Sequence, residues 1–107
     1  MDAVREDVEG LITKEVHAAN KKFPMFHSNH EGAAVIFEEI QEAEEQMNEV
    51  YRTFKILWDL IKHDVESEHC VSVIRESAIK LSVEAIQVAA MAEKFLASSE
   101  RRVNEDN

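Results

Sequence analysis

The most constraining feature of this 107-residue chain is a long stretch without a helix breaker. After Gly32, neither Gly nor Pro occurs before the polar stretch at residues 63–69. A helix over residues 30–62 would be about 50 Å long at about 1.5 Å per residue. A compact domain of this size is only about 30–35 Å across. Part of the helix must therefore find cover outside a compact single-chain fold.

Apolar residues recur through this stretch at three- and four-residue steps, the pattern of one face of a helix. They are Ile36, Ile40, Ala43, Met47, Val50, Tyr51, Phe54, Trp58 and Ile61. A first, shorter helix is predicted over residues 2–21, and Pro24 ends it because the residue before a proline is disfavoured in a helix. Ser28 and Glu31 have the spacing of a capping box, which predicts that the long helix starts near residue 29 or 30.

A third helix is predicted over residues 70–97, followed by a frayed polar tail at residues 98–107. Three helices of such unequal length rarely close a core alone. We therefore expect a single all-α domain over residues 1–107, a helical bundle of one shorter and two long helices that is completed by homo-oligomerisation. A homodimer or a homotetramer would satisfy this expectation.

Composition narrows the classes of partner. Twelve Lys and Arg residues against 22 Asp and Glu give a formal charge of −10, which argues against nucleic acid and against an anionic membrane surface as partners. No apolar run approaches the roughly 20 residues of a membrane span, and the acidic start of the chain does not resemble a signal peptide. The single cysteine, Cys70, fits a reducing compartment. We expect a cytoplasmic protein.

Two pairs of polar residues suggest a metal site. Glu39 and Glu42 lie three apart on the flank of the apolar stripe, and Glu84 and Gln87 repeat this spacing on the third helix. Like charges at this spacing, with Cβ atoms about 5–6 Å apart, destabilise a helix unless a cation lies between them. If the pairs face each other, their oxygens would hold one or two Mg²⁺ ions. The alternative from sequence alone, a solvated acidic face, stays open.

Three segments resemble a known family. Residues 30–42 (HEGAAVIFEEIQE) and 84–96 (EAIQVAAMAEKFL) look like the phage and prophage branch of the MazG-like all-α nucleoside triphosphate pyrophosphohydrolases. The first helix, from GLITKEV at residues 10–16 through KFP at residues 22–24, is similar to members of that branch as well. The resemblance covers most of residues 8–96, and the order of the segments is more specific than the acidic pair.

The resemblance implies Mg²⁺-dependent cleavage of a ribo- or deoxyribonucleoside triphosphate to the monophosphate and pyrophosphate, with Mn²⁺ as an alternative ion. In the family, an ExxE motif on one helix and an ExxD motif on the next hold the metals. Glu39 and Glu42 match the first motif, and Glu84 matches the first residue of the second. Glu38 is an adjacent carboxylate that would orient or deprotonate the attacking water. Gln87 stands where the family has Asp.

This departure leaves two functions open. An amide oxygen can ligate Mg²⁺ but brings no charge, so Gln87 should weaken both metal binding and water activation. The alternative function is a catalytically degenerate module of the same fold that serves oligomerisation or partner binding. If the enzyme is active, Lys80 would contact phosphate, or else form an ion pair with Glu76 or Glu84. Phe26 is the aromatic residue expected nearest to a nucleotide base.

Overall fold

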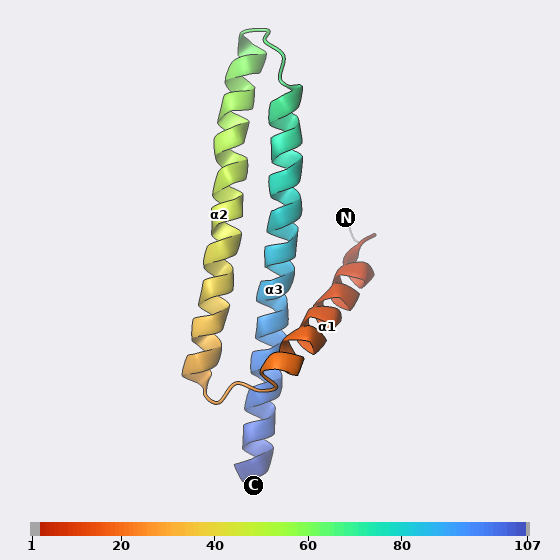
Figure 1. The fold of residues 1–107 in the computed structure, drawn as a ribbon, viewed down its shortest axis with the longest axis vertical. Helices are drawn as coiled ribbons and strands as arrows, with labels where there is room; N and C mark the ends of the chain where they lie inside the picture. Colours follow the sequence, from red (N-terminus) through yellow and green to blue (C-terminus); the bar gives the residue numbers. More distant parts are fainter. Residues whose placement is uncertain (1–2, 107) are drawn as a thin grey trace.

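The computed structural model describes residues 3–106, and the side chains of residues 3–101. It contains helices α1 (Arg5–Lys22), α2 (Asn29–Lys62) and α3 (Glu68–Asp106), and the described residues include no strand. Figure 1 shows α2 and α3 as a long antiparallel hairpin, with α1 against the C-terminal half of α3. The molecule measures 67 × 29 × 22 Å. The all-α class and the long second helix are confirmed.

Local sequence signals account for the helix ends. Ser28 is extended, and its Oγ accepts the N–H of Glu31 at 3.1 Å, so the predicted N-cap is confirmed. Phe23, which precedes Pro24, is also extended and lies directly after the last residue of α1. After α2 the chain turns at Asp64, whose φ of 54° places it in the left-handed region.

The connector between α1 and α2, residues 23–28, is fixed to α3 by hydrogen bonds. The Phe26 N–H donates to Ser98 Oγ at 3.0 Å, and Lys94 Nζ donates to the carbonyl of Phe23. Ser98 is 1% exposed and Lys94 4% exposed. These bonds join segments that lie more than seventy residues apart in sequence.

The expectation of a frayed tail from Ser98 is wrong. Helix α3 continues to Asp106, and only Asn107 of the expected tail lies outside the described residues. The helix continues because Ser98 is buried against the connector. In addition, Ser99 Oγ donates to Asn29 Oδ1 at 3.2 Å. Long-range contacts therefore order a segment whose composition is that of a polar tail.

Gly32 allows α2 to approach α3 closely near its N-terminus. It is buried, and a Cβ built there would lie 2.5 Å from Phe95 Cδ2 and 3.1 Å from Phe26 Cδ2. A glycine at this position lets both rings pack against the backbone of α2.

The core of a single chain is thin. Among the described residues, the buried hydrophobic side chains are Phe26, Leu57 and Ala90. On α2, the buried residues Thr53 and Leu57 lie outside the predicted apolar stripe. Most of that stripe is exposed, so it is not the seam between α2 and α3. Its exposed members are Ile40, Met47, Tyr51, Phe54, Trp58 and Ile61.

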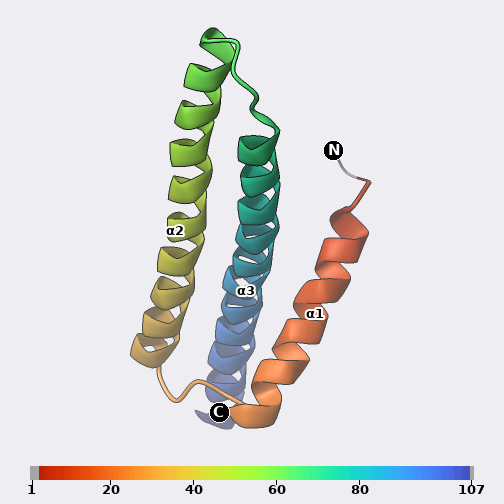
Figure 2. The same cartoon turned by 45° about the horizontal axis from the view of Figure 1, so that its top comes forward.

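Helix α1 packs against α3, and its backbone stays away from α2. Figure 2 shows α3 between the other two helices, with α1 diverging toward its N-terminus. Helices α1 and α2 therefore flank α3 without packing against each other. Within the part of the chain that the structure describes, no helix is apolar enough over sufficient length to cross a membrane.

Candidate metal centre

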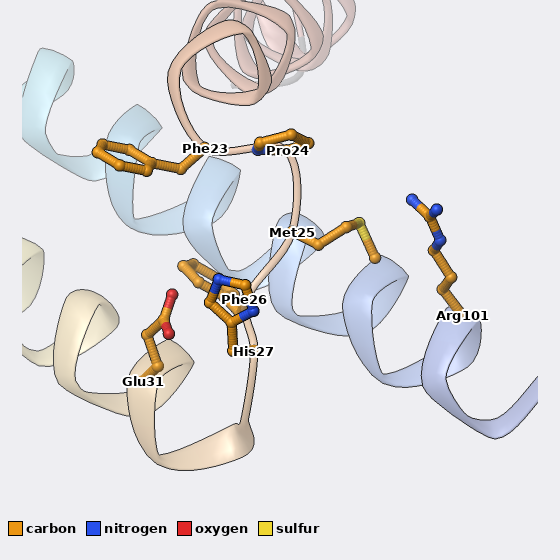
Figure 3. A pocket seen from close by; sticks show the side chains of 7 residues that line it. All are labelled: Phe23, Pro24, Met25, Phe26, His27, Glu31 and Arg101. Carbon is orange, nitrogen blue, oxygen red and sulfur yellow. The ribbon is translucent and has the colours of Figure 1, made fainter. Parts of the chain in front are cut away.

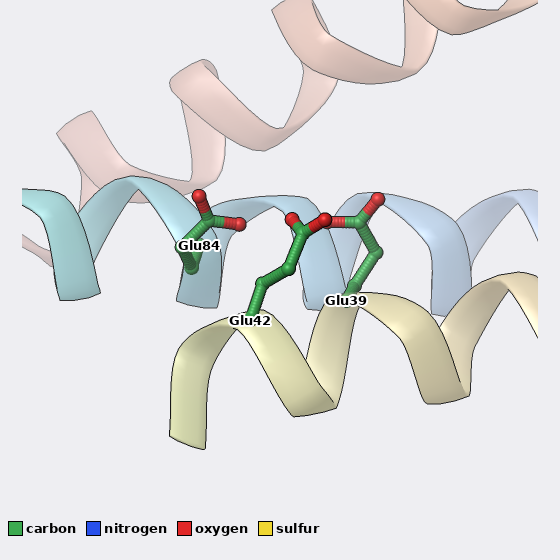
Figure 4. A group of neighbouring side chains, drawn as sticks. All are labelled: Glu39, Glu42 and Glu84. Atoms are coloured by element: carbon green, nitrogen blue, oxygen red, sulfur yellow. The ribbon is translucent and has the colours of Figure 1, made fainter. Parts of the chain in front are cut away.

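Three carboxyl groups meet between α2 and α3. One carboxylate oxygen from each of Glu39, Glu42 and Glu84 lies within 4.8 Å of the other two. Figure 4 shows the three side chains pointing toward one another and toward the side on which α1 lies. Glu39 and Glu84 are half-buried, and Glu42 is exposed. The spacing of three on α2 and the antiparallel packing of α3 bring them together, and the group could hold a metal ion.

Gln87 lies beside the three carboxylates, and Glu39, Glu42, Glu84 and Gln87 together form the acidic group. With its amide nitrogen turned toward the carboxylates, it donates to Glu39 Oε2 at 3.0 Å and to Glu84 Oε2 at 3.2 Å. A donor in this position offsets part of the repulsion between the carboxylates. The same amide rotated by a half turn would present its oxygen as a metal ligand. The structure therefore unites Glu39, Glu42, Glu84 and Gln87, as the spacing predicted.

The electrostatics of the group favour a cation. Burial raises the pKa of Glu39, and the charge of Glu42, a hydrogen bond to Glu42 and the charges of Glu38 and Glu15 raise it further. The pKa of Glu84 is raised by burial, then by a hydrogen bond with Glu42 and by the charges of Glu42 and Glu39.

Among the residues whose side chains the structure describes, no basic side chain forms an ion pair with these carboxylates. The ion pairs formed within the described residues are Arg5 with Glu9, Arg52 with Glu49, and Lys62 with Asp59. None of them includes a member of the acidic group. Within residues 3–101 the carboxylates are therefore concentrated without an ion-pair partner, and a divalent ion would supply the missing positive charge.

Two predicted site residues lie outside the group. Glu38 is exposed and acts on the group through its charge, which contributes to the raised pKa of Glu39. Lys80 is exposed and, within the described part of the chain, pairs with neither Glu76 nor Glu84. It lines a separate polar hollow of about 600 Å³ together with Glu45, Gln46, Asn48, Glu49, Arg52, Val73, Glu76 and Ser77.

A groove adjoins the acidic group. It has a volume of about 540 Å³ and is lined from all three helices by Glu15, Ala18, Ala19, Lys22, Phe23, Phe26, Glu31, Val35, Glu39, Gln87, Met91 and Lys94. Glu39 and Gln87 belong to both the groove and the group. A ligand in the groove could therefore contact Glu39 and Gln87 of the acidic group, and Lys22 and Lys94 line the same groove.

Lys94 is a residue of this groove that sequence reasoning missed. Its Nζ lies 4.8 Å from the centroid of the Phe26 ring, within cation–π range. Burial lowers the pKa of Lys94, and the charge of Glu31 opposes this effect. The available signal was its spacing, because Lys94 follows Gln87 by seven residues, or about two turns, and so lies on the same face of α3.

The expected role of Phe26 is not supported. Its side chain is 5% exposed, and its ring packs between Lys94 and Gly32. Phe26 therefore holds the connector in place, and little of its surface is free to stack on a base.

A second hollow lies at the connector itself. It has a volume of about 480 Å³ and is lined by Phe23, Pro24, Met25, Phe26, His27, Glu31 and Arg101. Figure 3 shows these side chains around the connector, with Glu31 on α2 and Arg101 on α3. The acidic group does not line this hollow, so the groove beside Glu39 is the better candidate for a ligand of the metal centre.

Comparison of the chain with protein-family models, with curated proteins and with solved structures gives no match. The resemblance to the MazG-like enzymes stays a prediction.

Proposed function

We propose that the chain is a Mg²⁺-dependent nucleoside triphosphate pyrophosphohydrolase of the MazG-like phage and prophage type, with Mn²⁺ as an alternative ion. The observation that carries this proposal is the meeting of Glu39, Glu42 and Glu84 within 4.8 Å beside a groove. Oxygen ligands from two facing helices suit a hard divalent cation. A triphosphate is a substrate that an acidic site binds only through such a cation.

The residues of the site have separate roles toward the metal, the attacking water and the substrate. Glu39, Glu42 and Glu84 bind the metal, and Gln87 contributes its amide oxygen. When bound, the metal neutralises phosphate charge and lowers the pKa of a coordinated water. Glu38 orients or deprotonates the attacking water from its exposed position beside Glu39.

The groove is the proposed site of the nucleoside. Ala18, Ala19, Val35 and Met91 give it an apolar lining, as small-molecule sites generally have. The phosphates then lie toward Glu39, where the groove meets the acidic group. Lys80, about one turn before Glu84, contacts phosphate as a point charge.

The assembly and the compartment belong to the same proposal. The chain acts in the cytoplasm as a homodimer or homotetramer. The exposed stripe on α2 supports an oligomer, because soluble monomers rarely expose contiguous apolar patches larger than a few hundred Å².

A second candidate function is favoured by Gln87. Its two hydrogen bonds to Glu39 and Glu84 satisfy carboxylates that would otherwise bind metal. A chain that stabilises its acidic group in this way can keep the fold without the chemistry. It would then serve as a catalytically degenerate module for oligomerisation or partner binding.

Pyrophosphate release separates the two functions. The assay takes a panel of ribo- and deoxyribonucleoside triphosphates with Mg²⁺ or Mn²⁺, and compares the wild type with Glu39→Gln and Glu84→Gln. The control is Glu93→Gln, an exposed carboxylate of α3 outside the acidic group. The enzyme predicts release that both site variants abolish and the control retains. No release from folded wild-type protein, together with release from Gln87→Asp, would favour the degenerate module.

A further inference from the structure

The two faces of the α2–α3 hairpin differ in chemistry. One face carries α1 and the acidic group. Further along the hairpin it carries the polar hollow that includes Glu49 and Lys80. These two residues lie seven positions, or about two turns, from Glu42 and Gln87, which places them on the same face.

The opposite face is apolar. Near the N-terminus of α2 it holds a hollow of about 390 Å³ whose lining consists only of apolar residues, namely Ala33, Ile36, Phe37, Ile40, Ala92, Phe95 and Leu96. On α2, Ile36 and Ile40 each follow a residue of the groove by one position. They therefore lie about 100° round the helix from Val35 and Glu39.

The apolar face continues along α2 as an exposed seam. Met47, Tyr51, Phe54, Trp58 and Ile61 follow one another at steps of four, three, four and three residues. They are 36–58% exposed. This spacing is that of a seam against another long helix, and α3 does not occupy it.

The exposed area matches a dimer interface. Eight large side chains lie on this face, with exposed fractions of 36–69%: Phe37, Ile40, Met47, Tyr51, Phe54, Trp58, Ile61 and Leu96. Together they expose on the order of 800 Å², given that one aromatic side chain buries about 150–250 Å². A stable interface needs about 800 Å² from each partner.

We propose that a second copy of the chain packs antiparallel along this seam, α2 against α2, with a two-fold axis close to Glu49. A two-fold axis there would pair Ile40 with the partner's Trp58, and Met47 with the partner's Tyr51. Phe37 would meet the partner's Ile61. These three pairs are apolar on both sides and are formed twice, as an isologous interface requires, and Phe54 lies beside the partner's Glu44.

The charges flanking the seam fit the same arrangement. Glu44 and Lys55 lie on the same flank of α2, and the proposed axis places Glu44 beside the partner's Lys55. In a parallel two-fold pair, Glu44 and Lys55 would instead lie at different heights along the axis and would not meet. The antiparallel dimer deepens the oligomer proposed above, and it leaves the acidic group of each copy on the outer face.

Sedimentation of the full chain tests the seam. We expect Tyr51→Arg to reduce the mass of the wild-type assembly by half or more while far-ultraviolet circular dichroism stays helical. The matched control is Ile56→Arg, which changes another exposed apolar residue of α2 (55% exposed) that lies off the seam. This control should keep the wild-type mass. A monomeric wild type, or an unchanged mass for Tyr51→Arg, would overturn the proposal.

Charge exchange tests the register. Glu44→Lys and Lys55→Glu should each weaken association by about two- to tenfold, because the two-fold axis places two such exposed ion pairs in the interface, and the double variant should restore association. A double variant weaker than both single variants would exclude this register.

The only tryptophan, Trp58, gives a readout that needs no variant. In the dimer its emission should be blue-shifted and protected from acrylamide, and dilution to monomer should remove both effects. Emission that does not change with association would overturn the proposal. None of these readouts uses pyrophosphate release, so a failed interface and a failed enzymatic function are distinguishable.

Discussion

Gln87 is the residue on which the chemistry of the acidic group depends most. Its amide donates to Glu39 and Glu84, whereas an aspartate there would add a fourth negative charge. Gln87→Asp should therefore lower the melting temperature without metal and enlarge the stabilisation by Mg²⁺ or Mn²⁺. Thermal melts with and without metal measure both effects, with Gln41→Asp on the exposed surface of α2 as the control. An unchanged metal response would place Gln87 outside the site.

Glu84 makes the stability of the fold depend on pH. The pKa of Glu84 is raised above its ordinary value of 4.5, so the folded state binds protons more readily than the unfolded chain. The carboxyl group therefore favours folding below about pH 4.5, and this contribution is lost as pH rises through the raised pKa. Without metal, Glu84→Gln should melt at a higher temperature than the wild type at neutral pH.

The difference between Glu84→Gln and the wild type should disappear in acid, because the wild-type carboxyl group is then neutral as well. Melts of both proteins across pH in the presence of a chelator measure it. A Glu84→Gln variant less stable than the wild type at neutral pH would show that neighbouring groups already stabilise the Glu84 carboxylate, and it would contradict this prediction.

At the scale of elements, Ser98 links the connector to α3. Ser98→Ala removes the acceptor of the Phe26 N–H, and the loss of a buried hydrogen bond costs about 1–3 kcal/mol. We expect a lower free energy of unfolding, and faster hydrogen exchange in α1 and the connector than in the middle of the α2–α3 hairpin. The matched control is Ser72→Ala, because Ser72 is exposed on α3. Equal effects of the two variants would contradict this role of Ser98.

The predictable parts of the elements were those that local sequence determines. Pro24 and the Ser28 cap act within a few residues, so the C-terminal end of α1 and the N-terminal end of α2 follow from the local sequence alone. The burial of Lys94 and Ser98 depends on contacts with residues 71 and 72 positions away. Composition made Ser98 part of a polar tail, and no local pattern could place the connector against Ser98 and Lys94.

The whole molecule, 67 Å in its longest dimension, combines an acidic face and an apolar face on one hairpin. Spacing and the family resemblance predicted the acidic group, because a step of three residues fixes which side chains share a face. The groove beside it was not predictable, since it depends on α1 packing against α3 and diverging from α2. The apolar stripe was visible in the sequence, but only the structure shows that α3 leaves it exposed.

Metal binding tests the central claim most directly. Isothermal titration of the wild-type chain with Mn²⁺ should show saturable binding that Mg²⁺ displaces. Glu42→Gln should weaken it by at least about tenfold, because even groups that only orient metal ligands cost 10–100-fold when removed. Glu93→Gln should leave it unchanged. Absence of binding, or equal binding by wild type and Glu42→Gln, would contradict the assignment of a metal centre to the two facing helices.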